Sequence, residues 1–246
     1  MNTSNRKVAI ITGASRGIGS EIAKRLSQEG FAVVVNYASS APEADTLVAT
    51  LQAQGGQALA VKANVASAQE VKRLFDEAEQ HFGGVDVLVN NAGIMALATL
   101  AETDDDSVNR QIDINFKGTF NTLREAAQRM RDGGRVVNFS SSVVAMLQPT
   151  YGVYAGTKAA VEAMTSVFAK ELRGRNITVN AVAPGPTATD LFLNGKPQDV
   201  VDRLSKLAPL ERLGQPQDIA ATVAFLASVD GSWINGQTLR ANGGII

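Results

Sequence analysis

The chain has 246 residues, of which 45% are apolar and 19% charged, and it contains no cysteine. A formal net charge of −1 gives no general attraction for nucleic acid or anionic lipid, and the lack of cysteine excludes disulfides, thiol nucleophiles and thiolate metal sites. His81 is the single histidine, so a multi-histidine centre is excluded too, and we expect no metal site.

The first residues, MNTSNRKVAIITG, lead into a short apolar run without the hydrophobic segment and cleavage site of a secretory leader. No apolar stretch reaches about 18 residues, the minimum for crossing a bilayer. We therefore expect a cytoplasmic protein with no membrane or nucleic-acid partner.

Seven short runs have the β-branched, apolar composition of buried strands: 7–12, 32–37, 57–63, 85–90, 135–140, 177–183 and 236–241. The segments between them have helical patterns at 17–29, 42–54, 67–82, 103–131 (one helix or two), 152–173 and 216–228. Repeated alternation of strand and helix predicts a parallel sheet with right-handed crossovers. We expect one α/β domain over residues 1–246, a Rossmann-type doubly wound sheet of about seven strands with helices on both faces.

One late segment interrupts this alternation. Five of the seven prolines fall between Pro184 and Pro216. An excursion of this length in a compact domain predicts a substrate-covering lid near 186–213. A long surface loop that contains a helix is the alternative.

A glycine-rich turn, TGASRGIG at 12–19, lies between the first strand and the first helix. Gly13, Gly17 and Gly19 allow a sharp turn and let a ligand approach the helix N-terminus, where free N–H groups favour a pyrophosphate. Their G-x-x-x-G-x-G spacing differs from the common G-x-G-x-x-G dinucleotide fingerprint. Its place at the first strand–helix junction nevertheless favours a bound dinucleotide.

The end of the second strand indicates which dinucleotide. NAD-specific proteins usually have an acid there to hold the ribose 2′-hydroxyl, but this chain has Asn36 and Tyr37. Arg16 lies inside the glycine loop. A missing carboxylate and a nearby guanidinium favour a 2′-phosphate, and hence NADP(H).

A different reading of the same loop is a serine hydrolase. Residues 13–17, with Ser15 at the centre, match the G-x-S-x-G nucleophile elbow. That chemistry needs a histidine late in the chain, whereas His81 lies near the end of a predicted helix and no histidine follows it. Hydrolysis through Ser15 stays a remote alternative.

Six motifs then occur in order: TGASRGIG (12–19), NNAG (90–93), the asparagine of INFKG (114–118), SSS (140–142), Tyr154-x-x-x-Lys158 and PGPTATD (184–190). Together they resemble the short-chain dehydrogenase/reductase family over essentially the whole chain, in particular its 3-oxoacyl-carrier-protein-reductase-like branch.

The resemblance implies four catalytic residues: Ser141, Tyr154, Lys158 and Asn115. Ser142 is the fallback for the serine. It also implies cofactor contacts from Gly13, Ser15, Arg16, Gly17, Ile18, Gly19, Asn36, Asn64, Val65, Asn91, Ala92, Gly93, Tyr154, Lys158, Pro184, Gly185 and Thr187. Asn64 stands where many members have an aspartate for the adenine amino group, and its side-chain carbonyl can still accept that hydrogen bond.

These residue types suit carbonyl reduction, which delivers hydride to carbon and a proton to oxygen. A phenol has a pKa of about 10, and the cation of Lys158 is expected to lower the pKa of Tyr154 toward a useful range. Ser141 would orient the carbonyl oxygen, and Asn115 would hold a water between Lys158 and solvent. The expected activity is NADPH-dependent reduction of a 3-oxoacyl thioester or small ketone to a secondary alcohol, and the alternative is a catalytically idle NADP-binding sensor or scaffold.

Substrate and assembly stay open at this level. The excursion contains LFL (191–193) and RLSKLAPLERL (203–213), apolar enough for an acyl chain, a steroid or a small ring ketone. Arg129, Arg131, Arg173 and Arg175 either receive an acidic carrier protein or are solvated helix ends. The family resemblance implies a homotetramer, and the apolar stripe at 161–172 either serves such an interface or faces the sheet.

Overall fold

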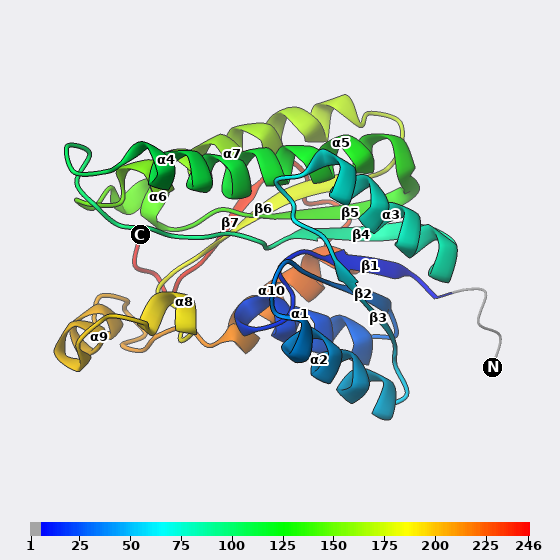
Figure 1. The fold of residues 1–246 in the computed structure, drawn as a ribbon, viewed down its shortest axis with the longest axis horizontal. Coiled ribbons are helices and arrows are strands. Elements are labelled where there is room, and N and C mark those ends of the chain that lie inside the picture. Colours follow the sequence, from blue (N-terminus) through cyan, green and yellow to red (C-terminus); the bar gives the residue numbers. More distant parts are fainter. Residues whose placement is uncertain (1–5) are drawn as a thin grey trace.

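The computed structural model describes residues 6–246 and confirms the predicted α/β class. Its single sheet has seven parallel strands in the order β3-β2-β1-β4-β5-β6-β7 (Figure 1). The strands are β1 (Val8–Ile11), β2 (Ala32–Tyr37), β3 (Gln57–Lys62), β4 (Val85–Asn90), β5 (Met130–Phe139), β6 (Thr178–Pro184) and β7 (Thr238–Ala241). The order reverses between β1 and β4, and ligands of such sheets bind beyond the carboxyl ends of the strands at that point. Residues 1–5, part of the predicted domain and of the segment searched for a leader, lie outside the described residues.

Helices cover both faces of the sheet, as predicted. One face carries α1 (Gly17–Gln28), α2 (Ala41–Ala53) and α10 (Pro216–Ala227), and the other carries α3 (Ala68–Phe82), α5 (Gly118–Arg129) and α7 (Gly152–Glu171) (Figure 1). Successive strand side chains point to opposite faces, so Ile11 packs on the α1 side and Ile10 on the α3 side. Two buried faces explain why the strand sequences are apolar at nearly every position.

The structure differs from the predicted elements in two places. The segment 103–131 forms α4 (Asp105–Gln111), a π-helical turn η2 (Ile112–Lys117) and then α5, without a loop between them. Strand β5 begins at Met130 instead of 135, because Met130 already pairs with Val85 before the ladder becomes irregular. Both differences follow from packing against neighbouring elements.

The predicted excursion is confirmed between β6 and α10. It contains the short helices α8 (Asp190–Leu193) and α9 (Gln198–Ser205), which project beyond the sheet (Figure 1). Its action as a lid stays a prediction. Among residues 6–246, no helix combines the length and apolar character that a membrane crossing needs.

The apolar stripe of α7 faces the sheet, which decides between the two readings of 161–172. Val161, Thr165, Phe168 and Leu172 are all buried against the strands. Val167 lies outside this stripe and is exposed. An interface at α7 would therefore use other side chains than the stripe.

A buried chain of polar side chains connects α5, β4, β5 and α7. Thr122 donates from Oγ1 to Asn90 Oδ1 (2.7 Å), Asn90 Nδ2 donates to Asn138 Oδ1 (2.8 Å), and Asn138 Nδ2 donates to Thr165 Oγ1 (2.8 Å). All four side chains are buried. Because buried polar groups are costly when left without partners, this chain ties the two strands that carry the site to two helices.

Replacing Asn138 with alanine should therefore destabilise the protein by about 2–4 kcal/mol, since it leaves two buried partners unsatisfied and opens a cavity. Asn109→Ala, at an exposed position of α4, is the matched control and should change stability by less than about 0.5 kcal/mol. Urea unfolding of both variants measures the difference. Equal midpoints for Asn138→Ala and the control would contradict the assigned network.

Candidate active site

Two adjoining cavities lie beyond the carboxyl ends of the strands. The glycine-loop cavity is lined by the turn after β1 and by the ends of β2, β3 and β4. The tyrosine cavity is lined by the ends of β5 and β6, the start of α7 and the excursion. Both are lined by Ile18, Asn91, Gly93, Thr189 and Leu191, so they form one continuous cleft.

The glycine loop is shaped by its packing against the end of β4. A Cβ on Gly19 would lie 2.5 Å from Gly13 O and 2.6 Å from Asn91 Nδ2, and a Cβ on Gly13 would lie 2.9 Å from Ala92 Cα. Asn91 Nδ2 donates to Gly13 O at 2.9 Å. No side chain caps α1 at its N-cap residue Arg16, so the helix terminus is available to an anion in the glycine-loop cavity. These features fit a dinucleotide pyrophosphate.

Asn36 lines this cavity, but its amide is committed inside the protein. The side chain is 1% exposed; Oδ1 accepts from Gly13 N at 3.2 Å and Nδ2 donates to Ala63 O at 2.9 Å. Asn36 therefore holds the glycine loop next to the end of β3. The sequence had predicted that Asn36 contacts the cofactor. We infer that any contact from its side chain is secondary to this tether.

The residues directly after β2 supply the groups that face the cavity there. They are Ala38, Ser39 and Ser40, which were not among the predicted contacts, and they follow Tyr37, the last residue of β2, which also lines the cavity. Arg16 lines the same cavity, is exposed, and has no ion pair within residues 6–246. This corner thus combines hydroxyl groups with a guanidinium, which suits a phosphate.

Asn64 and Val65 also line the glycine-loop cavity, as expected. Asn64 Oδ1 accepts from Ala66 N at 3.0 Å, and Asn64 N donates to Glu70 Oε2 at 2.9 Å. A carbonyl oxygen has two lone pairs, so Asn64 keeps one acceptor site.

Two of the three consecutive serines are bound to other parts of the protein. Ser140 Oγ donates to Glu162 Oε1 at 2.6 Å. Ser142 is buried; its Oγ donates to Ala183 O at 3.3 Å and accepts from Asn242 Nδ2 at 3.1 Å. Neither hydroxyl is free to bind a ligand.

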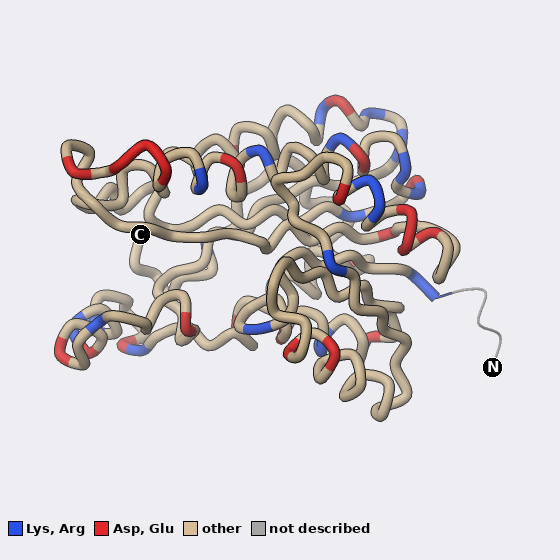
Figure 2. The backbone as a smooth tube through the Cα atoms, viewed as in Figure 1, with Lys and Arg blue, Asp and Glu red and all other residues tan. Residues whose placement is uncertain are grey.

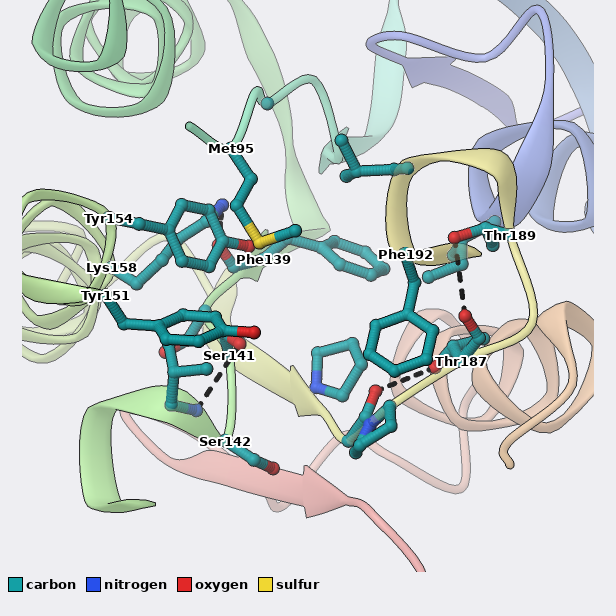
Figure 3. Close-up of a pocket in the computed structure, with 18 of the residues that line it drawn as sticks. Met95, Phe139, Ser141, Ser142, Tyr151, Tyr154, Lys158, Thr187, Thr189 and Phe192 are labelled. Atoms are coloured by element: carbon teal, nitrogen blue, oxygen red, sulfur yellow. Dashed lines mark hydrogen bonds between the residues drawn. The ribbon is translucent and has the colours of Figure 1, made fainter. Parts of the chain in front are cut away.

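Ser141 has the remaining hydroxyl. It accepts only a long hydrogen bond, 3.4 Å, from Val143 N and lies beside the Tyr154 hydroxyl (Figure 3). Figure 3 shows Ser141 and Tyr154 turned toward the same cavity, whereas Ser142 points away from it. The geometry favours Ser141 over Ser142.

Tyr154 and Lys158 lie on adjacent turns at the start of α7. The Lys158 side chain is 4% exposed, and its Nζ donates to Phe139 O at 2.8 Å. Nζ also lies 5.7 Å from the centroid of the Tyr154 ring. The predicted pair is therefore brought together at the end of β5.

The pKa values of this pair differ from the sequence expectation. Burial raises the pKa of Tyr154 to about 12; the adjacent Ser141 hydroxyl acts in the opposite direction, and the neighbouring Tyr151 raises the pKa further. Burial also lowers the pKa of Lys158 to about 8. The expected lowering of the Tyr154 pKa by Lys158 is therefore wrong for the protein side chains alone, because burial is the largest cause of the shift and Lys158 is not among its causes. At neutral pH Tyr154 carries its proton.

Asn115 lies in the π-helical turn η2 and is fully buried. Its Oδ1 accepts from Ile94 N at 2.8 Å, and its Nδ2 donates to Ile94 O at 2.9 Å and to Thr157 Oγ1 at 3.2 Å. The side chain thus joins the loop after β4 to α7. Its predicted role in holding a water stays a prediction.

Gly93 completes this junction. A Cβ there would lie 3.3 Å from Asn115 Oδ1 and 3.5 Å from Lys158 Nζ. A methyl group at this position would be tight against Asn115 Oδ1 and in ordinary contact with the ammonium. Gly93 lines both cavities, whereas Lys158 lines the tyrosine cavity.

The other predicted residues of the second cavity are in place. Pro184, Gly185 and Thr187 line it; Thr187 Oγ1 donates to Gly185 O at 2.9 Å. Phe192 and Leu204 belong to the apolar stretches that were expected to face a substrate, and Thr189 belongs to the PGPTATD motif. Sequence reasoning missed the rest of the wall, which only the fold brings together: Met95, Val143, Met146, Gln148 and Tyr151.

The geometry gives Ser15 no base for hydrolysis. Ser15 lines the glycine-loop cavity, whereas His81 is exposed at the end of α3 and lies 3.5 Å from Glu77. His81 does not line either cavity.

Comparison with known proteins identifies the family. A family model described as enoyl-(acyl carrier protein) reductase matches residues 13–246. A short-chain type dehydrogenase/reductase of Picea abies is 47% identical, with 97% of this chain and 92% of that protein covered. The chain belongs to the short-chain dehydrogenase/reductase family.

Two further relatives agree with this assignment. The 3-oxoacyl-[acyl-carrier-protein] reductase FabG of Staphylococcus epidermidis is 44% identical to this short-chain dehydrogenase/reductase, with 97% and 98% of the two chains covered. The structure of a short chain dehydrogenase from Burkholderia cenocepacia in complex with NADP superposes with a TM-score of 0.93 at 35% identity, covering 99% of each chain. The protein is an oxidoreductase of this family, and the resemblance seen in the sequence is confirmed.

Gly19→Ala should destabilise this short-chain dehydrogenase/reductase by about 1–3 kcal/mol, because the new methyl group meets the Gly13 carbonyl and the Asn91 amide. Gly156→Ala is the matched control: Gly156 is also helical, but a Cβ there meets nothing within 4 Å. Alanine at 156 should stabilise by up to about 1 kcal/mol through helix propensity. Urea unfolding compares the two, and a neutral Gly19→Ala would show that the loop does not depend on this close approach.

Proposed function

We propose that the protein reduces a ketone to a secondary alcohol, with NADPH as hydride donor and Tyr154 as proton donor. The observation that carries the proposal is the group formed by Tyr154, Ser141 and Lys158. A protonated phenol lies beside the one uncommitted serine hydroxyl and above a buried ammonium, in a cavity continuous with the glycine loop.

The glycine-loop cavity fits the cofactor, which supplies the hydride when it is bound. The loop and the α1 N-terminus would hold the pyrophosphate, and Arg16, Ser39 and Ser40 would hold the 2′-phosphate. The adenine would contact Asn64 and Val65, the ribose next to the nicotinamide would contact Asn91, Gly93 and Lys158, and the nicotinamide would contact Pro184, Gly185 and Thr187. The NADP complex of the Burkholderia cenocepacia relative supports this choice of dinucleotide.

The protein's own part in the reaction is to place charge and a proton at the carbonyl oxygen. Negative charge grows on that oxygen as hydride reaches the carbon, so hydrogen bonds from Ser141 and Tyr154 strengthen along the reaction. The Tyr154 O–H bond then breaks and its proton passes to the substrate oxygen. Lys158, which is mostly protonated near pH 7 with a pKa of about 8, stabilises the phenolate that remains.

Tyr154→Phe should lower kcat by about 10²- to 10⁴-fold, because the ring is retained while the proton donor is lost. NADPH affinity, measured by fluorescence titration, should change less than about threefold, since the cofactor contacts lie mainly in the glycine-loop cavity. NADPH oxidation with a ketone panel gives the rates. An idle NADP-binding sensor or scaffold would bind NADPH but show no ketone-dependent oxidation in the unmodified protein, and retention of most activity by Tyr154→Phe would exclude that residue as the proton donor.

Cofactor choice gives a second test. The Michaelis constant for NADPH should be clearly lower than that for NADH, and Arg16→Ala should raise the NADPH value about tenfold while leaving NADH nearly unaffected. Arg25→Ala, at the other end of α1 and paired with Glu29, is the control for loss of an arginine from the same helix. An equal effect of Arg16→Ala on both cofactors would contradict a 2′-phosphate contact.

Assembly as a homotetramer and a cytoplasmic location stay predictions. Large apolar side chains that remain exposed support an interface near η2 and α5, where Ile112, Phe116 and Phe120 lie. A second exposed group, at the end of α10 and just after it, consists of Phe225, Val229 and Trp233.

A further inference from the structure

Building on the proposed function, we propose that the substrate is an uncharged, largely apolar ketone, free in solution, with a second neutral oxygen that binds the Tyr151 hydroxyl. The family model and the relatives described above do not share one substrate, so the walls of the tyrosine cavity must distinguish among the possibilities.

The walls around the reacting groups are apolar and come from three separate segments. Met95 follows β4, Val143 and Met146 belong to the short helix α6 (Val143–Met146), and the excursion contributes Leu191, Phe192 and Leu204. In Figure 3, Met95 lies beside Tyr154, and Phe192 lies across the cavity from them, with the Phe139 ring in between. Such walls bind hydrocarbon and aromatic surface.

The cavity offers no counter-charge for an anionic substrate. Within the described part of the chain, residues 6–246, Lys158 is the only charged residue that lines it, and its ammonium already donates to Phe139 O. A carboxylate or phosphate placed on the apolar wall would lose its water without gaining a cationic partner, at a large cost in free energy. The cavity therefore selects neutral compounds.

Two neutral polar side chains face the cavity without a partner in the protein. Within residues 6–246, neither the Tyr151 hydroxyl nor the Gln148 amide makes a hydrogen bond, although both residues line the cavity. Burial raises the pKa of Tyr151, so its hydroxyl stays protonated and can donate. Figure 3 places that hydroxyl next to Ser141. A substrate with a neutral oxygen near the reacting carbonyl would satisfy Tyr151 when it binds.

The surface beside the cavity opposes an acidic carrier protein. Glu102 and the run Asp104 to Asp106 are exposed at the start of α4, in the chain segment that follows Met95. This segment is held near the cavity because Leu100 packs on Gly152 at the start of α7. Figure 2 shows the acidic segment at the same end of the molecule as α9. Arg203, Lys206 and Arg212 of the excursion are exposed at this end as well, so a highly acidic partner would be repelled where it approaches the start of α4.

The arginines considered as a carrier site are elsewhere and are largely paired. Arg129 contacts Asp76, Glu79 and Glu125, and Arg131 contacts Asp86. Arg175 pairs with Asp132.

Two of these arginines also lie far from the reacting groups. Tyr154 is in the first turn of α7, whereas Arg173 and Arg175 follow the last turn of this 20-residue helix, about 30 Å away. Arg129, Arg131 and Arg175 are ion-paired, so neither a free carrier site nor solvated helix ends describes them.

Four aryl ketones test the proposal with NADPH: propiophenone, 1-phenyl-1,2-propanedione, benzoylformate, and ethyl benzoylformate as the neutral counterpart of the acid. We expect kcat/KM for ethyl benzoylformate to exceed that for benzoylformate at least 100-fold. We also expect Tyr151→Phe to lower the dione-to-propiophenone ratio of kcat/KM about 3- to 10-fold, the loss of one hydrogen bond. Comparing the dione-to-propiophenone ratio of kcat/KM between the variant and the unmodified protein cancels the intrinsic reactivity of each ketone.

Tyr37→Phe is the matched control, because Tyr37 lines the glycine-loop cavity and should leave the dione-to-propiophenone ratio unchanged. A keto acid reduced as well as its ester, or an unchanged ratio in Tyr151→Phe, would overturn the inference while leaving the proposed function standing. Failure to oxidise NADPH with any of these ketones, despite tight NADPH binding, would overturn both.

A separate experiment tests whether the protein prefers a substrate bound to an acyl carrier protein. A 3-oxobutanoyl group is offered once as the N-acetylcysteamine thioester and once on an acyl carrier protein. We expect the carrier-bound form to have the lower kcat/KM and to gain relative to the free thioester as salt screens the acidic segment. A carrier-bound form that is preferred at low salt would overturn the inference.

Discussion

The hydrogen bond from the Lys158 ammonium to the Phe139 carbonyl oxygen is the constraint on which the site depends. A buried ammonium without an acceptor is costly, so α7 must sit where strand β5 ends. Tyr154 is one helical turn before Lys158, and Ser141 is two residues after Phe139. The hydrogen bond of Lys158 thus sets the distance between the proton donor Tyr154 and Ser141.

The hydrogen bonds that neighbouring polar groups make within the protein decide which side chains remain available for chemistry. Three side chains of types that often act in catalysis or binding instead make hydrogen bonds that connect two segments of the protein: Ser140, Asn36 and Asn115. Ser141 and Tyr151 are left with weak or no internal partners and face the cavity. An unsatisfied polar group in an otherwise satisfied environment is therefore the signal that points to a ligand.

Much of this arrangement could be predicted from the sequence, because β-branched runs and glycine turns are local signals and parallel strands bring the ends that carry motifs to one edge. The π-helical turn at Asn115 could not, since it depends on packing against Ile94 and α7. The sequence also shows that Lys158 is near Tyr154 but not how deeply both are buried, which is why the direction of the Tyr154 pKa was wrong. The internal hydrogen bonds of Asn36 could not be predicted either, because its partners, Gly13 and Ala63, are distant in the sequence.

The elements that hold the reacting groups differ in burial from the elements that line the substrate side of the cavity. The reacting groups stand on strands and helices whose inner faces are fully buried, whereas α8 and α9 bury no residue at all. Segments with few buried contacts open and close at little cost in free energy. Because Thr189 and Leu191 belong to the walls of both cavities, a dinucleotide in one cavity would bias the position of the excursion over the other. Changes in α8 and α9 can therefore alter the substrate without disturbing the proton donor, since the Lys158–Phe139 contact does not involve them.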